Sequence, residues 1–215
     1  MSVVLPPSSD HFNSLPEIIQ SDHVFKKRCT PEVLGDICQI FRKYRAQDIF
    51  GLALLHQHFE IQQNEKLVTF GNVAIPIRSS PDGLSVAASR WAFSGDKLIP
   101  YEFTAGAENI DMDTHVAFLV EMSQALHSSA LADNLGLCSA GSIAGKDSEP
   151  TMEFTSGRAN VTLPFDRDPL EGNSVDAAWK ITQGMNPLKT SGFEWLTVLR
   201  RPNTGHQQQH KNTKQ

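Results

Sequence analysis

The chain contains little cysteine, with three residues of this type in 215. Cys29, Cys38 and Cys138 form no Cys-x-x-Cys pair, so a zinc site made only of cysteines is excluded within one chain. An odd number of widely spaced cysteines is also more typical of reduced thiols than of a disulfide framework. We therefore expect three free thiols in a reducing compartment, the cytoplasm.

The chain also lacks a strong excess of positive charge and long apolar runs. Its formal net charge is −5 and its basic residues form no long stripe, which argues against a nucleic-acid partner. The apolar stretches are shorter than the roughly 20 residues that span a bilayer, and the first residues lack the pattern of an export signal. We expect a soluble protein without a membrane partner.

The hydrophobic residues of the chain suffice for one sizeable core. Hydrophobic residues make up 40% of the sequence, and the length suits one large domain better than two small ones. The start is rich in proline, serine and aspartate, which predicts an extended N-terminal arm over 1–28. The polar end predicts a disordered tail over 202–215, and residues 29–201 between the two are expected to form a single domain.

Two segments have the features of helices. Thr30, Pro31 and Glu32 provide an N-cap, a first-turn proline and a first-turn carboxylate, and apolar residues then follow at helical spacing as far as Tyr44. A second helix is expected to start at Asp111 or Asp113 and to run to about residue 134. Gly136 is the expected left-handed stop of this second helix.

Strand patterns occupy much of the remaining chain. Period-two patterns and turn residues predict strands at 49–61, 66–78, 84–93, 97–103, 137–143, 151–164, 175–183 and 193–200. Strict alternation of strand and helix is absent, so we predict an α+β fold in which two main helices pack on an antiparallel sheet. We favour a curved sheet, or partial barrel, around a pocket.

The clearest candidate site lies in the apolar run 49–61. His56, His58 and Glu60 alternate along it, and side chains two apart share one face of an extended strand. Imidazole is a good metal ligand and also titrates near neutral pH. His56 and His58 are therefore candidate ligands of a divalent metal, with Glu102, His115 or His127 as a further ligand from elsewhere in the chain.

This segment resembles the first motif of the cupins, in which a glycine precedes His-x-His, a glutamate and a second glycine. The residues in comparable places are Gly51, His56, His58, Glu65 and Gly71. The resemblance implies a metal site, but the intervals differ from those of the family. The second cupin motif, with proline, glycine, histidine and asparagine in order, has no counterpart at residues 100–115.

The same residues also suit chemistry without a metal. His58 or His56 could act as a general base, oriented by Glu60 or Glu102, in an isomerase, lyase or hydrolase reaction on a small molecule. The expected walls and partners of the pocket are Trp91, Tyr101, Glu102 and His115, with the Tyr101 hydroxyl as a hydrogen-bond donor.

Two further interpretations remain open from the sequence. His56 and His58 could be ordinary strand residues, one hydrogen-bonded inside the fold and one partly solvated. The protein could also be a non-catalytic module that binds a ligand or another protein, or that forms homo-oligomers through an exposed strand edge or apolar patch. Each interpretation requires different surroundings of the two histidines.

Overall fold

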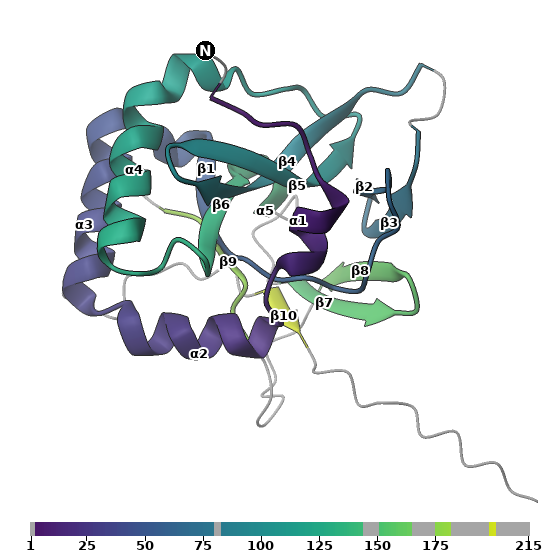
Figure 1. The fold of residues 1–215 in the computed structure, drawn as a ribbon, viewed down its shortest axis with the longest axis horizontal. Helices are drawn as coiled ribbons and strands as arrows, with labels where there is room; N and C mark the ends of the chain where they lie inside the picture. The colour runs from purple at the N-terminus through teal and green to yellow at the C-terminus, as the bar shows by residue number, and fades with distance from the viewer. Residues whose placement is uncertain (1–2, 80–82, 144–150, 165–174, 182–197, 201–215) are drawn as a thin grey trace, which may run out of the picture.

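The computed structural model describes residues 3–79, 83–143, 151–164, 175–181 and 198–200 (Figure 1). The helices are α1 (Ser9–Ser14), α2 (Ile18–Arg28), α3 (Pro31–Tyr44), α4 (Val116–Ser128) and α5 (Ala140–Ile143), with 3-10 turns η1 (Ala46–Asp48) and η2 (Met112–His115). The strands are β1 (Phe50–Leu54), β2 (Lys66–Phe70), β3 (Val73–Ile77), β4 (Val86–Ser94), β5 (Lys97–Ala105), β6 (Leu135–Ser139), β7 (Thr151–Ser156), β8 (Ala159–Pro164), β9 (Ala178–Trp179) and β10 (Val198–Arg200). The tail predicted at 202–215 lies outside the described residues.

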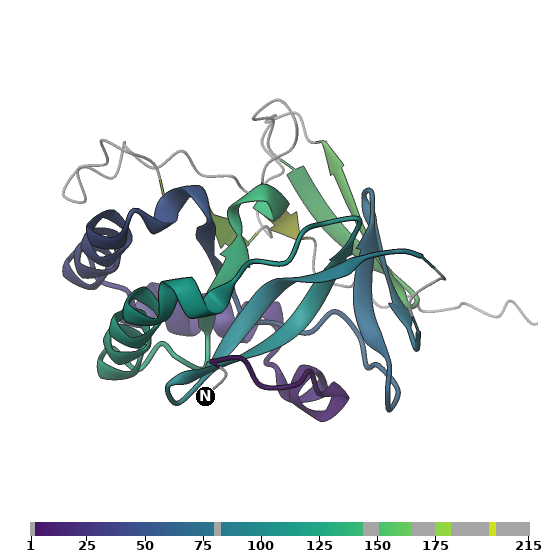
Figure 2. The same ribbon diagram turned by 90° about the horizontal axis from the view of Figure 1, so that it is seen from above.

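The strands form one curved sheet in the order β10-β7-β8-β3-β2-β5-β4-β6-β1-β9. Its pairings are antiparallel except β2 with β5 and β10 with β7, which are parallel. Figure 2 shows the sheet curling from the strands beside α3 and α4 round to the β7–β8 hairpin. The predicted α+β class with a curved sheet is confirmed, and the curl turns the hairpin toward β1 and β4.

Helices α3 and α4 lie side by side against the β1–β6 side of the sheet (Figure 1). The predicted start of α3 is confirmed, since the Thr30 hydroxyl accepts a hydrogen bond from Val33 N and Pro31 occupies the first turn. The Phe41 and Phe118 rings, one from each helix, meet edge to face at 5.1 Å. Within the described residues, no helix is long and apolar enough to cross a bilayer.

The segment predicted as an extended arm is mostly helical. Ser8 caps α1 by accepting a hydrogen bond from His11 N, and α2 follows from Ile18. The arm prediction gave too much weight to the prolines, because Pro6 and Pro7 lie before α1, Pro16 lies between α1 and α2, and none lies inside a helix. Phe12 and Ile18 are buried and anchor the two helices to the body of the protein.

The second long helix is shorter than predicted. α4 ends at Ser128, and Ala130 adopts a left-handed conformation at φ 53°. Gly136 does not stop the helix but lies inside β6, opposite Ala53 of β1. A Cβ atom at residue 136 would clash with the carbonyl oxygen of Trp91, so the glycine permits close approach of β4.

Strand β1 also ends earlier than predicted, at Leu54. Its partner β6 begins at Leu135, which is paired with Leu54, so β6 offers no strand partner beyond that point. The next amides bond elsewhere, Leu55 N to Asn134 O and Gln57 N to Pro16 O. His56 and His58 therefore lie in a buried connection after β1 and not on one face of a regular strand.

Strands β4 and β5 pair with an irregular register around Arg90. Arg90 is opposite Glu102, but the pairs on either side are Ala88 with Phe103 and Trp91 with Pro100. Ser89 and Tyr101 are thus the extra residues of two opposed bulges. Bulges bend strands and redirect side chains, often beside functional sites. This distortion places the charged side chains of Arg90 and Glu102 in the interior.

Candidate metal centre

Two imidazole rings meet just beyond the end of β1. His56 and His58 are 0% and 6% exposed, and their ring centroids are 4.8 Å apart at an interplanar angle of 75°. Residues 55 and 57 bond to neighbouring backbone, so the connection that carries the rings is anchored at two points. The rings are held inside the fold and do not lie on its surface.

Each ring has one nitrogen bound to an acceptor of the protein. His56 Nδ1 is 2.8 Å from the Leu54 carbonyl oxygen, and His58 Nε2 is 3.1 Å from Glu102 Oε1. Because a carbonyl and a carboxylate accept hydrogen bonds, these nitrogens carry the protons. In the neutral rings the lone pairs are then on His56 Nε2 and His58 Nδ1. This is the arrangement typical of metal-ligating histidines.

A third candidate ligand comes from the far side of the curved sheet. Glu153 lies on β7, and a ligand atom of its carboxylate, one of His56 and one of His58 all lie within 4.8 Å of one another. Glu153 Oε2 is buried and has no hydrogen-bond partner within the part of the chain that the structure describes. His56, His58 and Glu153 form a buried group that could hold a metal ion.

Arg90 joins the two buried carboxylates. Its Nε is 3.3 Å from Glu102 Oε2, and its Nη2 donates to Glu153 Oε1 at 3.1 Å. Burial alone would lower the pKa of Arg90, but Glu102 and Glu153 raise it well above the ordinary arginine value. The guanidinium is therefore a permanent buried cation that fixes both carboxylates.

The charges of these five residues do not balance when the imidazoles are neutral. Glu102 and Glu153 contribute two negative charges and Arg90 one positive charge, which leaves one net negative charge. Buried charge without compensation is costly, and the side chains of Arg90, Glu102 and Glu153 are only 6–8% exposed. A bound cation, or a proton on one imidazole, would compensate the excess.

No protein-family model, curated protein or solved structure matches the chain. The geometry of the site is therefore the basis for assigning its chemistry.

The structure places the other predicted site residues at several locations. Glu60 follows His58 but is exposed, outside the buried group. Trp91 and His115 pack edge to face on Phe50, at 6.2 and 5.3 Å, on the side of the sheet that α4 covers. His127 is on the exposed part of α4 and bonds within its own helix, to Ser123. Of the predicted orienting carboxylates, Glu102 is the one that contacts His58.

Sequence reasoning missed Arg90 and Glu153. Both are charged residues between apolar neighbours in the predicted strands 84–93 and 151–164. In Met152-Glu153-Phe154 the alternation predicts a solvent-facing glutamate, so the apolar run around Arg90 is the one signal that could have drawn attention to this region. That signal could not have shown that the two side chains meet, because their contact depends on the curl of the sheet.

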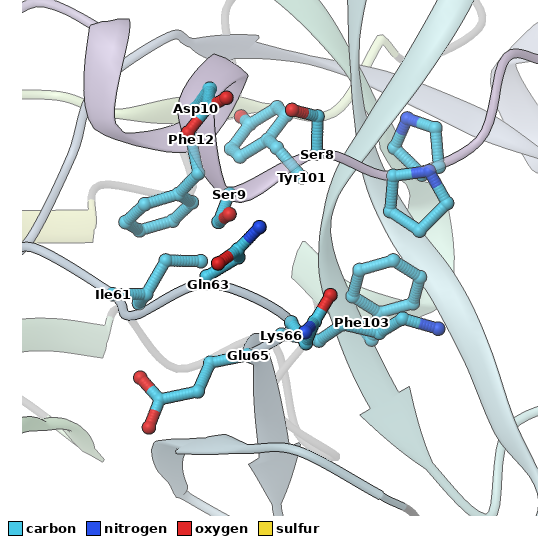
Figure 3. A pocket seen from close by; sticks show the side chains of 13 residues that line it. Ser8, Ser9, Asp10, Phe12, Ile61, Gln63, Glu65, Lys66, Tyr101 and Phe103 are labelled. Carbon is cyan, nitrogen blue, oxygen red and sulfur yellow. The ribbon is translucent and has the colours of Figure 1, made fainter.

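Tyr101 connects this region with a groove of about 440 Å³ on the surface. The groove runs between the start of α1 and strands β2 and β5, and Figure 3 shows Tyr101 and Phe12 in its wall and Glu65 at its edge. Lys66 Nζ lies 5.2 Å above the Phe103 ring in the same groove. The Tyr101 side chain is only 2% exposed, so it forms the inner end of the groove.

The predicted free thiols are confirmed, because Cys29, Cys38 and Cys138 form no disulfide. Cys138 is buried on β6, and its Sγ lies 3.3 Å from the Leu52 carbonyl oxygen. Burial raises the pKa of Cys138 to about 12, although Arg90 acts in the opposite direction. The thiol is therefore protonated at neutral pH, which fits a packing role.

Proposed function

We propose that the protein binds one divalent transition-metal ion through His56, His58 and Glu153. The observation that carries the proposal is the convergence of these three groups, with each imidazole bound through its other nitrogen to a fixed acceptor. Glu102 and the Leu54 carbonyl would then orient the ligands, and Arg90 would hold Glu153. A divalent ion would also remove the excess negative charge of the group.

Two imidazoles and one carboxylate are the ligands of hydrolytic zinc centres and of non-haem iron(II) centres. Three protein ligands leave at least one coordination position open, which distinguishes catalytic from structural zinc sites. A metal in this position would supply an activated water or a binding point for a small substrate. The function that the site supports best is therefore metal-assisted chemistry on a small molecule.

Elemental analysis of tag-free protein by inductively coupled plasma mass spectrometry tests the proposal. Wild-type protein should contain close to one equivalent of a transition metal, and His56→Ala and His58→Ala should lose it. His127→Ala is the matched control, because this exposed histidine lies outside the group and should leave the metal content unchanged. Equal metal content in all four proteins would contradict the proposal.

A metal-free function is the second candidate, supported by the 3.1 Å contact between His58 and Glu102. A carboxylate that accepts from one imidazole nitrogen orients the ring and strengthens the other nitrogen as a base. Under this alternative, wild-type protein contains no stoichiometric metal, and small molecules stabilise it against heat only when His58 is intact. The metal analysis therefore separates the two candidates.

A further inference from the structure

Two buried hydrogen-bond donors beside the candidate metal centre are not used within the described structure. Arg90 Nη1 and the Tyr101 hydroxyl are both buried, and neither makes a well-aligned hydrogen bond with another described residue, although Arg90 lies close enough to the hydroxyl to lower its pKa. Buried donors are normally paired, because an unpaired one has lost its hydrogen bonds to water without gaining a replacement. Two such donors in one place indicate a missing acceptor.

Arg90 contacts one of the proposed metal ligands, and Tyr101 lies beside Arg90. Arg90 Nη1 belongs to the planar group whose Nη2 lies 3.1 Å from Glu153 Oε1. Tyr101 is the extra residue of the β5 bulge, next in sequence to Glu102. Burial raises the pKa of Tyr101, although the nearby Arg90 lowers it, so the hydroxyl keeps its proton at neutral pH. Both groups are donors.

The net charge of the site with its metal indicates the chemical class of the acceptor. With a divalent ion bound, the group made of the metal, Arg90, Glu102, Glu153 and two neutral imidazoles carries one net positive charge. A monoanion would neutralise it. A carboxylate also has two oxygens, so that one can bind the metal while the other accepts from the two donors.

We propose that the substrate or ligand of this centre is a small monocarboxylate, bound between the metal and the donor pair of Arg90 and Tyr101. This inference depends on the proposed metal site and names the class of molecule that it takes. The burial of the group limits the ligand to a small one. The groove that ends at Tyr101 is the suggested approach from solvent (Figure 3).

The test uses cobalt(II)-substituted protein, whose visible absorption reports the ligands of the ion. Acetate should change the spectrum in a saturable way, whereas acetamide, its uncharged counterpart, should leave it unchanged. In Tyr101→Phe the affinity for acetate should fall about 10-fold or more, since a hydrogen bond to a charged group is lost. Without acetate, the variant should be about as heat-stable as the wild type, because the lost hydroxyl donates to no acceptor among the described residues.

Tyr44→Phe is the matched control, because Tyr44 is the other tyrosine of the chain and donates to Glu121 away from the site. It should bind acetate as the wild type does. Protein that binds no cobalt would contradict the proposed function and this inference together. Stoichiometric cobalt with no response to acetate, an equal response to acetamide, or an unchanged acetate affinity in Tyr101→Phe would overturn this inference alone.

Discussion

One side of the curved sheet is packed with aromatic rings, and the other side encloses charged side chains. Phe50 stacks on Phe118 at 5.4 Å and meets the edge of Trp91 at 6.2 Å, under helices α3 and α4. Trp91 follows directly after Arg90, whose guanidinium lies between two buried carboxylates. Strand β4 thus contributes to both regions through neighbouring residues.

Burial contributes differently to the free energy of folding in the two regions. Apolar rings gain free energy whenever they leave water, so the aromatic region stabilises the fold by itself. Buried ions lose hydration, and well-packed apolar residues in their place are often equally or more stable. The ionic region therefore contributes little net stability, and a function at His56, His58 and Glu153 would explain its presence.

Removing the buried positive charge of Arg90 should have the largest effect on the free energy of unfolding. In Arg90→Met, Glu102 and Glu153 would be buried without their positive partner, and we expect a loss of about 3–5 kcal/mol in the free energy of unfolding. Urea denaturation of the metal-free protein measures it. Met122→Leu, a volume-conserving change in the aromatic region, is the control and should cost less than about 1.5 kcal/mol. Equal losses in the two variants would show that the regions do not differ.

A single added methyl group should disturb the aromatic region. Gly136→Ala would place a Cβ against the carbonyl oxygen of Trp91 and force β4 and β6 apart. We expect a loss of about 1–3 kcal/mol by thermal or urea unfolding. Gly141→Ala is the control, because its nearest neighbour lies at an ordinary 3.8 Å. A Gly136→Ala protein as stable as the wild type would contradict the close approach of the strands.

Neutralising the carboxylate behind His58 should weaken metal binding without abolishing it. In Glu102→Gln the side chain keeps its size, but it no longer accepts from His58 as an anion. We expect a metal affinity about 10- to 100-fold lower with one equivalent still bound. Competition with a chromophoric chelator measures the affinity. Glu108→Gln, an exposed change, should have no effect, and an unchanged affinity in Glu102→Gln would remove Glu102 from the site.

The smallest expected effect concerns the ion pair between Glu65 and Arg158. Arg158 lies in the turn of the β7–β8 hairpin, so the pair ties the hairpin that carries Glu153 to the segment before β2. The hydrogen bond from Arg158 lowers the pKa of Glu65 below its ordinary value of 4.5. Arg158 is half exposed, and we expect Glu65→Gln to cost less than about 1 kcal/mol.

The lowered pKa of Glu65 predicts how the effect of Glu65→Gln on stability changes with pH. Because the pKa of Glu65 is lowered in the folded state, its contribution is fully present above pH 4.5 and disappears as the pH falls further. Thermal unfolding should therefore show a difference between wild type and Glu65→Gln at pH 7 that narrows toward pH 3. A difference that grows on acidification would contradict the ion pair.

The sequence predicted the features that depend on neighbouring residues. The start of α3 followed from Thr30 and Pro31, and the candidate site followed from the spacing of His56 and His58, although β1 ends before both. Glu153 could not be predicted, because its approach depends on the curl of the sheet. Arg90 meets Glu102 because the register shifts at Ser89 and Tyr101, and bulges of this kind leave no clear local pattern.

In the proposed metal site, Glu153 is the third ligand beside the two histidines. The most direct test is calorimetric titration of zinc into chelator-stripped wild-type protein and the Glu153→Gln variant, with Glu121→Gln as a surface control. We predict one equivalent bound by wild type and control, and an affinity more than about 100-fold lower in Glu153→Gln, since a direct ligand should matter more than the residues behind it. Equal zinc affinity in all three proteins would show that Glu153 is not a ligand of the metal.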